Sequence, residues 1–170
     1  YDDDLDASGD CEAIAQPIFH AVAGLGTDAA ALLRIVCTTA SQLWAEDKIP
    51  TAYEAVSDGA SLLEAVGGDT SGDFRQALLM KMKPSRFHVW AELLKKAGPD
   101  KLGTDEDTII RILTCCQTPG MSLSDSIAQL STVYEEVVGE PLSEMLDSEL
   151  SFNFGDAVEL LIDELYTTDP

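Results

Sequence analysis

The chain has 170 residues, of which 31 are Asp or Glu and 10 are Lys or Arg, so its net charge is −21 with both histidines neutral. Such a surface repels phosphate, which argues against binding to nucleic acid or anionic lipid unless a cation bridges the like charges. Because 45% of the residues are hydrophobic, a chain of this length can bury a core and is not expected to be disordered.

The front of the chain is acidic. Residues 1–12 hold six Asp or Glu side chains with almost nothing apolar between them, which predicts a solvated leader. No apolar run approaches the roughly 20 residues that span a bilayer, and no secretory signal is visible. Since the chain starts at Tyr1 and not at Met, processing at its front, and with it secretion, stays open.

From residue 13 onward the apolar positions recur at helical spacing. Short segments rich in Gly and Pro, such as Gly24-Leu25-Gly26 and Gly98-Pro99, separate the helical runs. This pattern predicts about ten short helices and an all-α fold. Four cysteines without a C-x-x-C unit favour reduced thiols over zinc or a disulfide scaffold.

An internal repeat organises this helical region. Gly26-Thr27-Asp28 recurs 77 residues later as Gly103-Thr104-Asp105, and Tyr53-Glu54 recurs as Tyr134-Glu135. The sequence therefore predicts two tandem units of about five helices each, residues 13–83 and residues 84–170.

Each unit combines a glycine loop with a distant acid. Thr27 and Thr104 are expected to cap the helix that follows the loop, and the glycines allow the loop to turn its carbonyl oxygens outward. Asp69 and Glu149 each stand ahead of a later helix that carries a phenylalanine, Phe74 or Phe154. Calcium binds six to eight oxygens, so loop carbonyls and one carboxylate, completed by water, would suit it.

The sequence resembles the annexins over residues 13–166. The segments that carry the resemblance are Gly24-Leu25-Gly26-Thr27-Asp28, Gly68-Asp69-Thr70-Ser71-Gly72, Met82-Lys83-Pro84-Ser85-Arg86 and Leu102-Gly103-Thr104-Asp105-Glu106. Annexins usually carry four five-helix repeats in a curved disc and bind acidic phospholipid through calcium on the convex face. The resemblance thus implies an all-α fold of two tandem five-helix annexin-like repeats.

The resemblance also implies one calcium site in each unit, built from three main-chain oxygens and one carboxylate. The first site would use Val22, Gly24 and Gly26 with Asp69, and the second Pro99, Lys101 and Gly103 with Glu149. Two departures from the family pattern bear on this expectation. Lys101 replaces a loop glycine, which leaves metal binding by the second unit open, and Thr39 and Cys116 stand where annexins usually carry an arginine.

The expected function is calcium-dependent binding to acidic phospholipid membranes, without catalysis. The expected location is cytoplasmic with reversible membrane association. With two repeats in place of four, the chain is either half of a longer protein or one of two copies that pair. The alternative is a calcium-independent structural module with a protein or cytoskeletal partner. Release of that partner by a chelator would separate the two readings.

Overall fold

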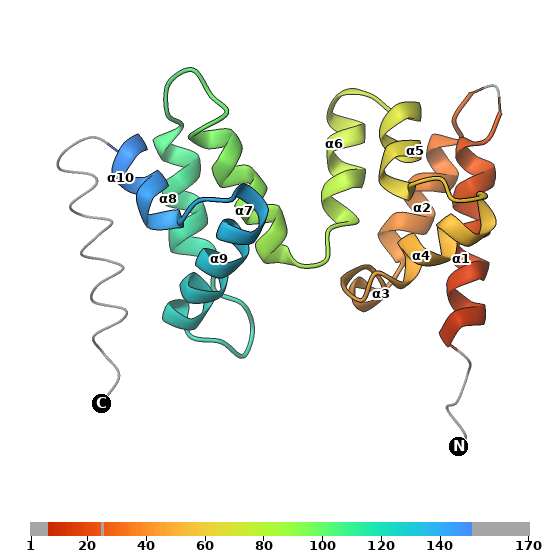
Figure 1. Ribbon diagram of the computed structural model, residues 1–170, viewed down its shortest axis with the longest axis horizontal. Helices are drawn as coiled ribbons and strands as arrows, with labels where there is room; N and C mark the ends of the chain where they lie inside the picture. Colours follow the sequence, from red (N-terminus) through yellow and green to blue (C-terminus); the bar gives the residue numbers. More distant parts are fainter. Residues whose placement is uncertain (1–6, 25, 151–170) are drawn as a thin grey trace. The chain divides into compact units, whose positions relative to one another are not determined.

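The computed structural model describes residues 7–24 and 26–150. This part of the chain holds ten α-helices and no strand, as the sequence predicts (Figure 1). The chain divides into two compact units, Tyr1–Ser85 and Arg86–Pro170, close to the predicted repeat boundary. No helix of the described residues is long and apolar enough to cross a membrane.

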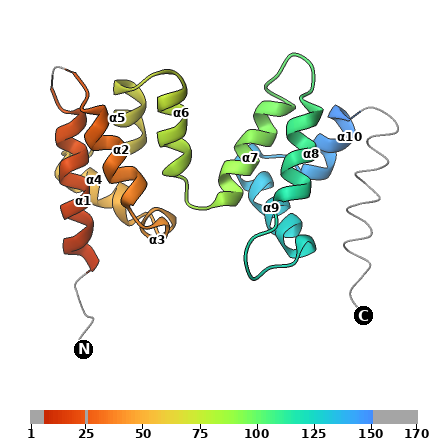
Figure 2. The same ribbon diagram turned by 180° about the vertical axis from the view of Figure 1, so that it is seen from behind.

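The first unit contains six helices. They are α1 (Ala7–Val22), α2 (Ala29–Thr38), α3 (Ser41–Ala45), α4 (Lys48–Val56), α5 (Leu62–Asp69) and α6 (Gly72–Lys81). Helix α1 packs against α4 and α2, and both views of the ribbon show this (Figures 1 and 2). The core between them contains Ile18, Leu32, Trp44 and Tyr53, each almost completely buried.

The second unit contains four described helices. They are α7 (Arg86–Ala97), α8 (Glu106–Cys115), α9 (Leu123–Val138) and α10 (Leu142–Glu149). Helix α7 packs against α9 and α8 around a core that includes Leu94, Ile109 and Tyr134. Helix α9 begins with a capping box formed by Ser122 and Asp125 and ends at Gly139, which has a φ of 88°. The helix expected around Phe154 lies outside the described residues.

The predicted leader is too long. Helix α1 begins at Ala7, and Cys11 within it is only 2% exposed. Cys11, Ala15, Ile18 and Val22 recur at helical spacing and form one buried face, so Cys11 belongs to the helix that packs on the core and not to a solvated leader. The acids on either side of Cys11, Asp10 and Glu12 among them, misled the sequence interpretation. The rest of the predicted leader lies outside the described residues.

The positions where an arginine was expected carry small buried groups. The Thr39 hydroxyl donates to the carbonyl of Ile35 at 2.7 Å, and the Cys116 thiol lies 3.5 Å from the carbonyl of Leu113. Burial raises the pKa of the Cys116 thiol. All four cysteines are free, with Cys11 and Cys116 buried and Cys37 and Cys115 exposed. The end of α2 in the first unit and the end of α8 in the second therefore have an uncharged side chain where annexins usually carry an arginine.

Candidate metal sites

The first glycine loop joins α1 to α2. Gly24 and Gly26 have φ angles of 117° and 96°, in the region that side chains with a Cβ disfavour, and nothing lies within 4 Å of a Cβ built on either residue. The amide of Asp28 donates to the carbonyl of Ala21 at 2.9 Å, which closes the loop at its base. The loop thus turns sharply while its outer side stays open.

The predicted ligand carbonyls of this loop accept no main-chain hydrogen bond from the described residues. Among the described residues, the main-chain hydrogen bonds of the loop end on the carbonyls of Phe19, Ala21 and Thr27, and none ends on Val22, Gly24 or Gly26. Carbonyls without a protein donor must turn to water or to a cation. The donor set of the first loop therefore fits a hard cation that prefers oxygen.

The helix caps differ from the sequence prediction. Asp28, and not Thr27, caps α2 by accepting from the amide of Ala31 at 2.9 Å. In the same way Asp105, and not Thr104, caps α8 by accepting from the amide of Thr108 at 3.2 Å. Because each helix begins one residue later than expected, each threonine side chain is left for another partner.

That partner is the distant acid. The Thr27 hydroxyl donates to the main-chain oxygen of Asp69 at 2.7 Å, and the Thr104 hydroxyl donates to Oε2 of Glu149 at 2.6 Å. Figures 1 and 2 show the α1–α2 loop and the α5–α6 turn at the same end of the first unit. The structure therefore brings each predicted acid to its predicted loop.

Both acids end a short helix. Asp69 is the last residue of α5 and Glu149 is the last residue of α10. A negative charge is unfavourable at a helix C-terminus, where the helix dipole already places partial negative charge. A cation beside either carboxylate would relieve this repulsion.

The turn after Asp69 is held from several sides. Arg75 on α6 donates through Nε to the carbonyl of Thr70 at 2.7 Å, and the Thr70 hydroxyl donates to the carbonyl of Val66 at 2.5 Å. Gly72 follows with a φ of 59°. These bonds fix the backbone that carries the acid, whereas Asp69 itself is exposed.

In the second unit the side chain of Glu149 lies against the start of the α7–α8 loop. A Cβ built on the buried Gly98 would come within 3.1 Å of Cγ of Glu149 and 3.2 Å of Sδ of Met145. A larger residue at position 98 would therefore press on the side chains of Glu149 and Met145, which would have to shift by a few tenths of an ångström. Among the described residues, no main-chain hydrogen bond of this loop ends on the carbonyls of Pro99, Lys101 or Gly103.

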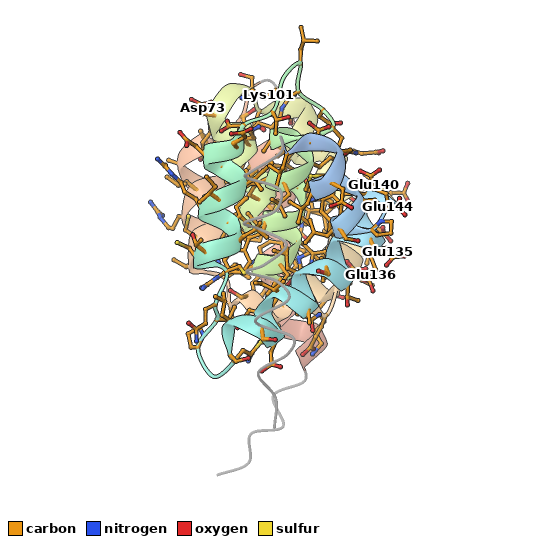
Figure 3. All side chains as sticks on the ribbon, turned by 90° about the vertical axis from the view of Figure 1, so that its left-hand side faces the viewer. Asp73, Lys101, Glu135, Glu136, Glu140 and Glu144 are labelled. Atoms are coloured by element: carbon orange, nitrogen blue, oxygen red, sulfur yellow. The ribbon has the colours of Figure 1, made fainter. Side chains whose placement is uncertain are left out.

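Lys101 is directed toward the start of α8 and not toward the acid. Its Nζ lies 3.1 Å from Oδ2 of Asp105, and this hydrogen bond lowers the pKa of the Asp105 carboxyl. The neighbouring Leu102 is fully exposed at the loop tip. Figure 3 shows Lys101 at the end of the loop, apart from the labelled glutamates of α9, α10 and the turn between them. The loop thus keeps its carbonyls open beside a neutralised lysine.

A buried tyrosine lies close to each acid. Burial, followed by the charge of Asp69, raises the pKa of Tyr53. Burial also raises the pKa of Tyr134, and Glu140, Glu149 and Asp100 add to the effect, Glu140 accepting a hydrogen bond from the phenol at 3.4 Å. The two tyrosines occupy corresponding positions of the repeat, and for both of them burial is the largest cause of the raised pKa.

The raised pKa of Tyr134 predicts a loss of stability at high pH. Above the ordinary tyrosine pKa of 10.0, the unfolded chain releases the phenolic proton while the native state keeps it. The free energy of unfolding therefore falls as the pH rises. We expect the urea midpoint to fall less steeply in Tyr134→Phe than in the wild type between about pH 9 and about pH 12. Equal slopes in the two proteins would contradict this assignment.

Side chains alone do not form a metal site here. Within residues 7–24 and 26–150 there is no group of three or more His, Cys, Asp or Glu side chains that could hold a metal ion. The candidate sites therefore depend on main-chain oxygens. Sequence reasoning missed the threonine links and the tyrosines, although both recur at matching repeat positions and this recurrence was the available signal.

The fold and these loops define a tandem helical-repeat protein with one carbonyl-rich loop and one facing acid in each unit. The annexin family model matches residues 13–80. Annexin A3 of Mus musculus is 29% identical over 158 residues, and annexin A4 of Homo sapiens is 30% identical over 142 residues. The matches cover 87% and 82% of this chain.

Solved structures agree on the fold. The chain matches a structure of an annexin A8 mutant with a TM-score of 0.78 and 22% identity, over 90% of this chain and 44% of that one. The chain belongs to the annexin family, whose members generally bind phospholipid in a calcium-dependent manner. It spans 46% and 40% of the annexin A3 and A4 sequences, somewhat less than half of each.

Proposed function

We propose that this chain binds acidic phospholipid membranes in a calcium-dependent manner through the α1–α2 and α7–α8 loops. One observation carries the proposal: each repeat hydrogen-bonds a carbonyl-rich glycine loop to an acid more than 40 residues away. The main-chain oxygens of Val22, Gly24 and Gly26 with Asp69 would hold the first ion. Those of Pro99, Lys101 and Gly103 with Glu149 would hold the second.

The donor sets explain why the membrane would complete the sites. Three carbonyls and one carboxylate supply fewer oxygens than the six to eight that calcium takes. Phosphoryl oxygens of lipid head groups can fill the remaining positions. Because each ligand then completes the site of the other, calcium and lipid should bind more tightly together than separately.

The charge of the protein supports dependence on a cation. At a net charge of −21 the chain is repelled by an anionic membrane. A divalent ion between carboxylate and phosphate reverses this repulsion locally. We therefore propose a peripheral protein that associates reversibly with the membrane.

Cosedimentation with phosphatidylserine vesicles tests the proposal. We expect the full chain to sediment with vesicles in calcium and to stay in solution in chelator, because only the ion links the two negative surfaces. Vesicles of phosphatidylcholine alone serve as the control for lipid charge. Equal binding in calcium and in chelator would overturn the proposal, and a cell-extract partner retained in chelator would favour the structural module.

A further inference from the structure

The two threonines of the glycine loops differ from the helical threonines Thr38 and Thr114 in the partners of their hydrogen bonds. Thr27 and Thr104 donate across 42 and 45 residues to Asp69 and Glu149. By contrast, Thr38 and Thr114 donate to carbonyls of their own helices, four residues back. The long-range bonds are thus placed at matching points of both repeats, and each joins the loop to the acid.

The two bonds hold their acids in different ways. The Thr27 hydroxyl donates to the main-chain oxygen of Asp69, so it fixes the end of α5, and this bond does not involve the carboxylate. The Thr104 hydroxyl donates directly to a carboxylate oxygen of Glu149. Aspartate has a short side chain that follows its backbone, whereas glutamate has an additional rotatable bond and must be held at its tip.

We propose that Thr27 and Thr104 are positioning residues, which hold the acid of each repeat against its glycine loop before any ion arrives. This inference rests on the proposed function, because it concerns the same two sites. A carboxylate oxygen that accepts a hydrogen bond from the threonine hydroxyl still has a lone pair that can bind a cation. The hydroxyl therefore fixes the acid near the loop without using up its metal-binding oxygens. Less conformational entropy is then lost when the ion binds.

Valine has nearly the same shape as threonine but carries a methyl group in place of the hydroxyl, so it removes the hydrogen bond with little change in shape. In the full chain with Asp69→Asn, which leaves the second site, Thr104→Val should weaken the binding of terbium about three- to tenfold. Terbium is a hard cation that takes oxygen ligands, and Tyr134 near Glu149 can sensitise its emission. With Glu149→Gln in place, Thr27→Val should weaken the first site by a similar factor.

Matched variants separate positioning from general stability. Thr114→Val and Thr38→Val remove a hydroxyl that bonds within its own helix and should leave terbium affinity unchanged. Thr104→Ser and Thr27→Ser keep a hydroxyl and should restore most of the affinity. Circular dichroism of each variant shows whether its helices remain, and the serine variants keep the test valid if a valine variant fails to fold.

A second readout needs no metal. The amide of Asp105 donates to the carbonyl of Ala97 at 2.7 Å, within the loop that Thr104 ties to Glu149. In chelator, this amide should exchange its hydrogen faster in Thr104→Val than in Thr114→Val. Unchanged exchange together with unchanged terbium affinity would overturn the positioning role alone. A wild-type chain that binds no terbium at either loop would overturn the proposed function, and this inference with it.

Discussion

Replacing Asp69 by Asn is expected to weaken calcium-dependent vesicle binding through the first unit by roughly a hundredfold, because a full charge beside a divalent ion is lost while the side-chain shape is kept. Asp69 is the only side-chain ligand that we propose for this site, and the other protein oxygens come from the main chain. The effect should therefore exceed that of any single change in the glycine loop that preserves the backbone.

Relative to the wild type, Asp69→Asn should be equally or slightly more stable without calcium and less stable with calcium. Without calcium, removing a negative charge from the C-terminal end of α5 relieves repulsion with the helix dipole, so the melting temperature should stay equal or rise slightly. With calcium, the wild type gains stability from the bound ion and the variant gains much less. A purely structural aspartate would lower the melting temperature in both conditions.

The matched control lies on the same helix. Glu64→Gln removes one negative charge from the first turn of α5, whereas Asp69 ends that helix. Cosedimentation with phosphatidylserine vesicles over a range of calcium concentrations should show a shift for Asp69→Asn and little shift for Glu64→Gln. Working with Glu149→Gln in both proteins isolates the first site. If the two variants shift the calcium dependence of vesicle binding equally, only net charge matters and the assignment of Asp69 to the site is wrong.

Much of the fold could be predicted because its signals are local and repeated. The spacing of apolar residues predicted the helices, and the recurrence of Gly26-Thr27-Asp28 predicted the two units. The loops were readable for the same reason, since glycine is the residue that accepts the positive φ angles found at Gly24, Gly26 and Gly103. The pairing of each loop with a distant acid came from the repeat, and the particular main-chain ligands came from the family resemblance.

The remaining features depend on tertiary contacts that no local pattern encodes. Whether Thr27 or Asp28 caps α2 is decided by a hydrogen bond to Asp69, 42 residues further on. In the same way, the burial of Cys11 against the first core extends α1 into an acidic segment that looked solvated. Residue type gives the candidates in such cases, and the packing of distant helices selects among them.

Leu102 should be the main apolar contact of the second loop with the membrane. Its side chain is 105% exposed, between the two predicted ligands Lys101 and Gly103, so packing within its own unit does not explain a leucine at this position. Burial of a leucine side chain contributes roughly 1.5–3 kcal/mol, so even partial insertion between lipid head groups would matter.

Leu102→Asn is therefore expected to weaken calcium-dependent vesicle binding by about tenfold while leaving the unfolding free energy unchanged, because the side chain makes no contact that folding needs. Leu33→Asn on α2 is the control, since that leucine is 49% exposed but belongs to a helix of the first unit and not to a glycine loop. Calcium affinity without vesicles should be the same in all three proteins, which separates lipid contact from ion binding. If Leu33→Asn weakens vesicle binding as much as Leu102→Asn, the loop tip is not the contact and the membrane meets another surface of the chain.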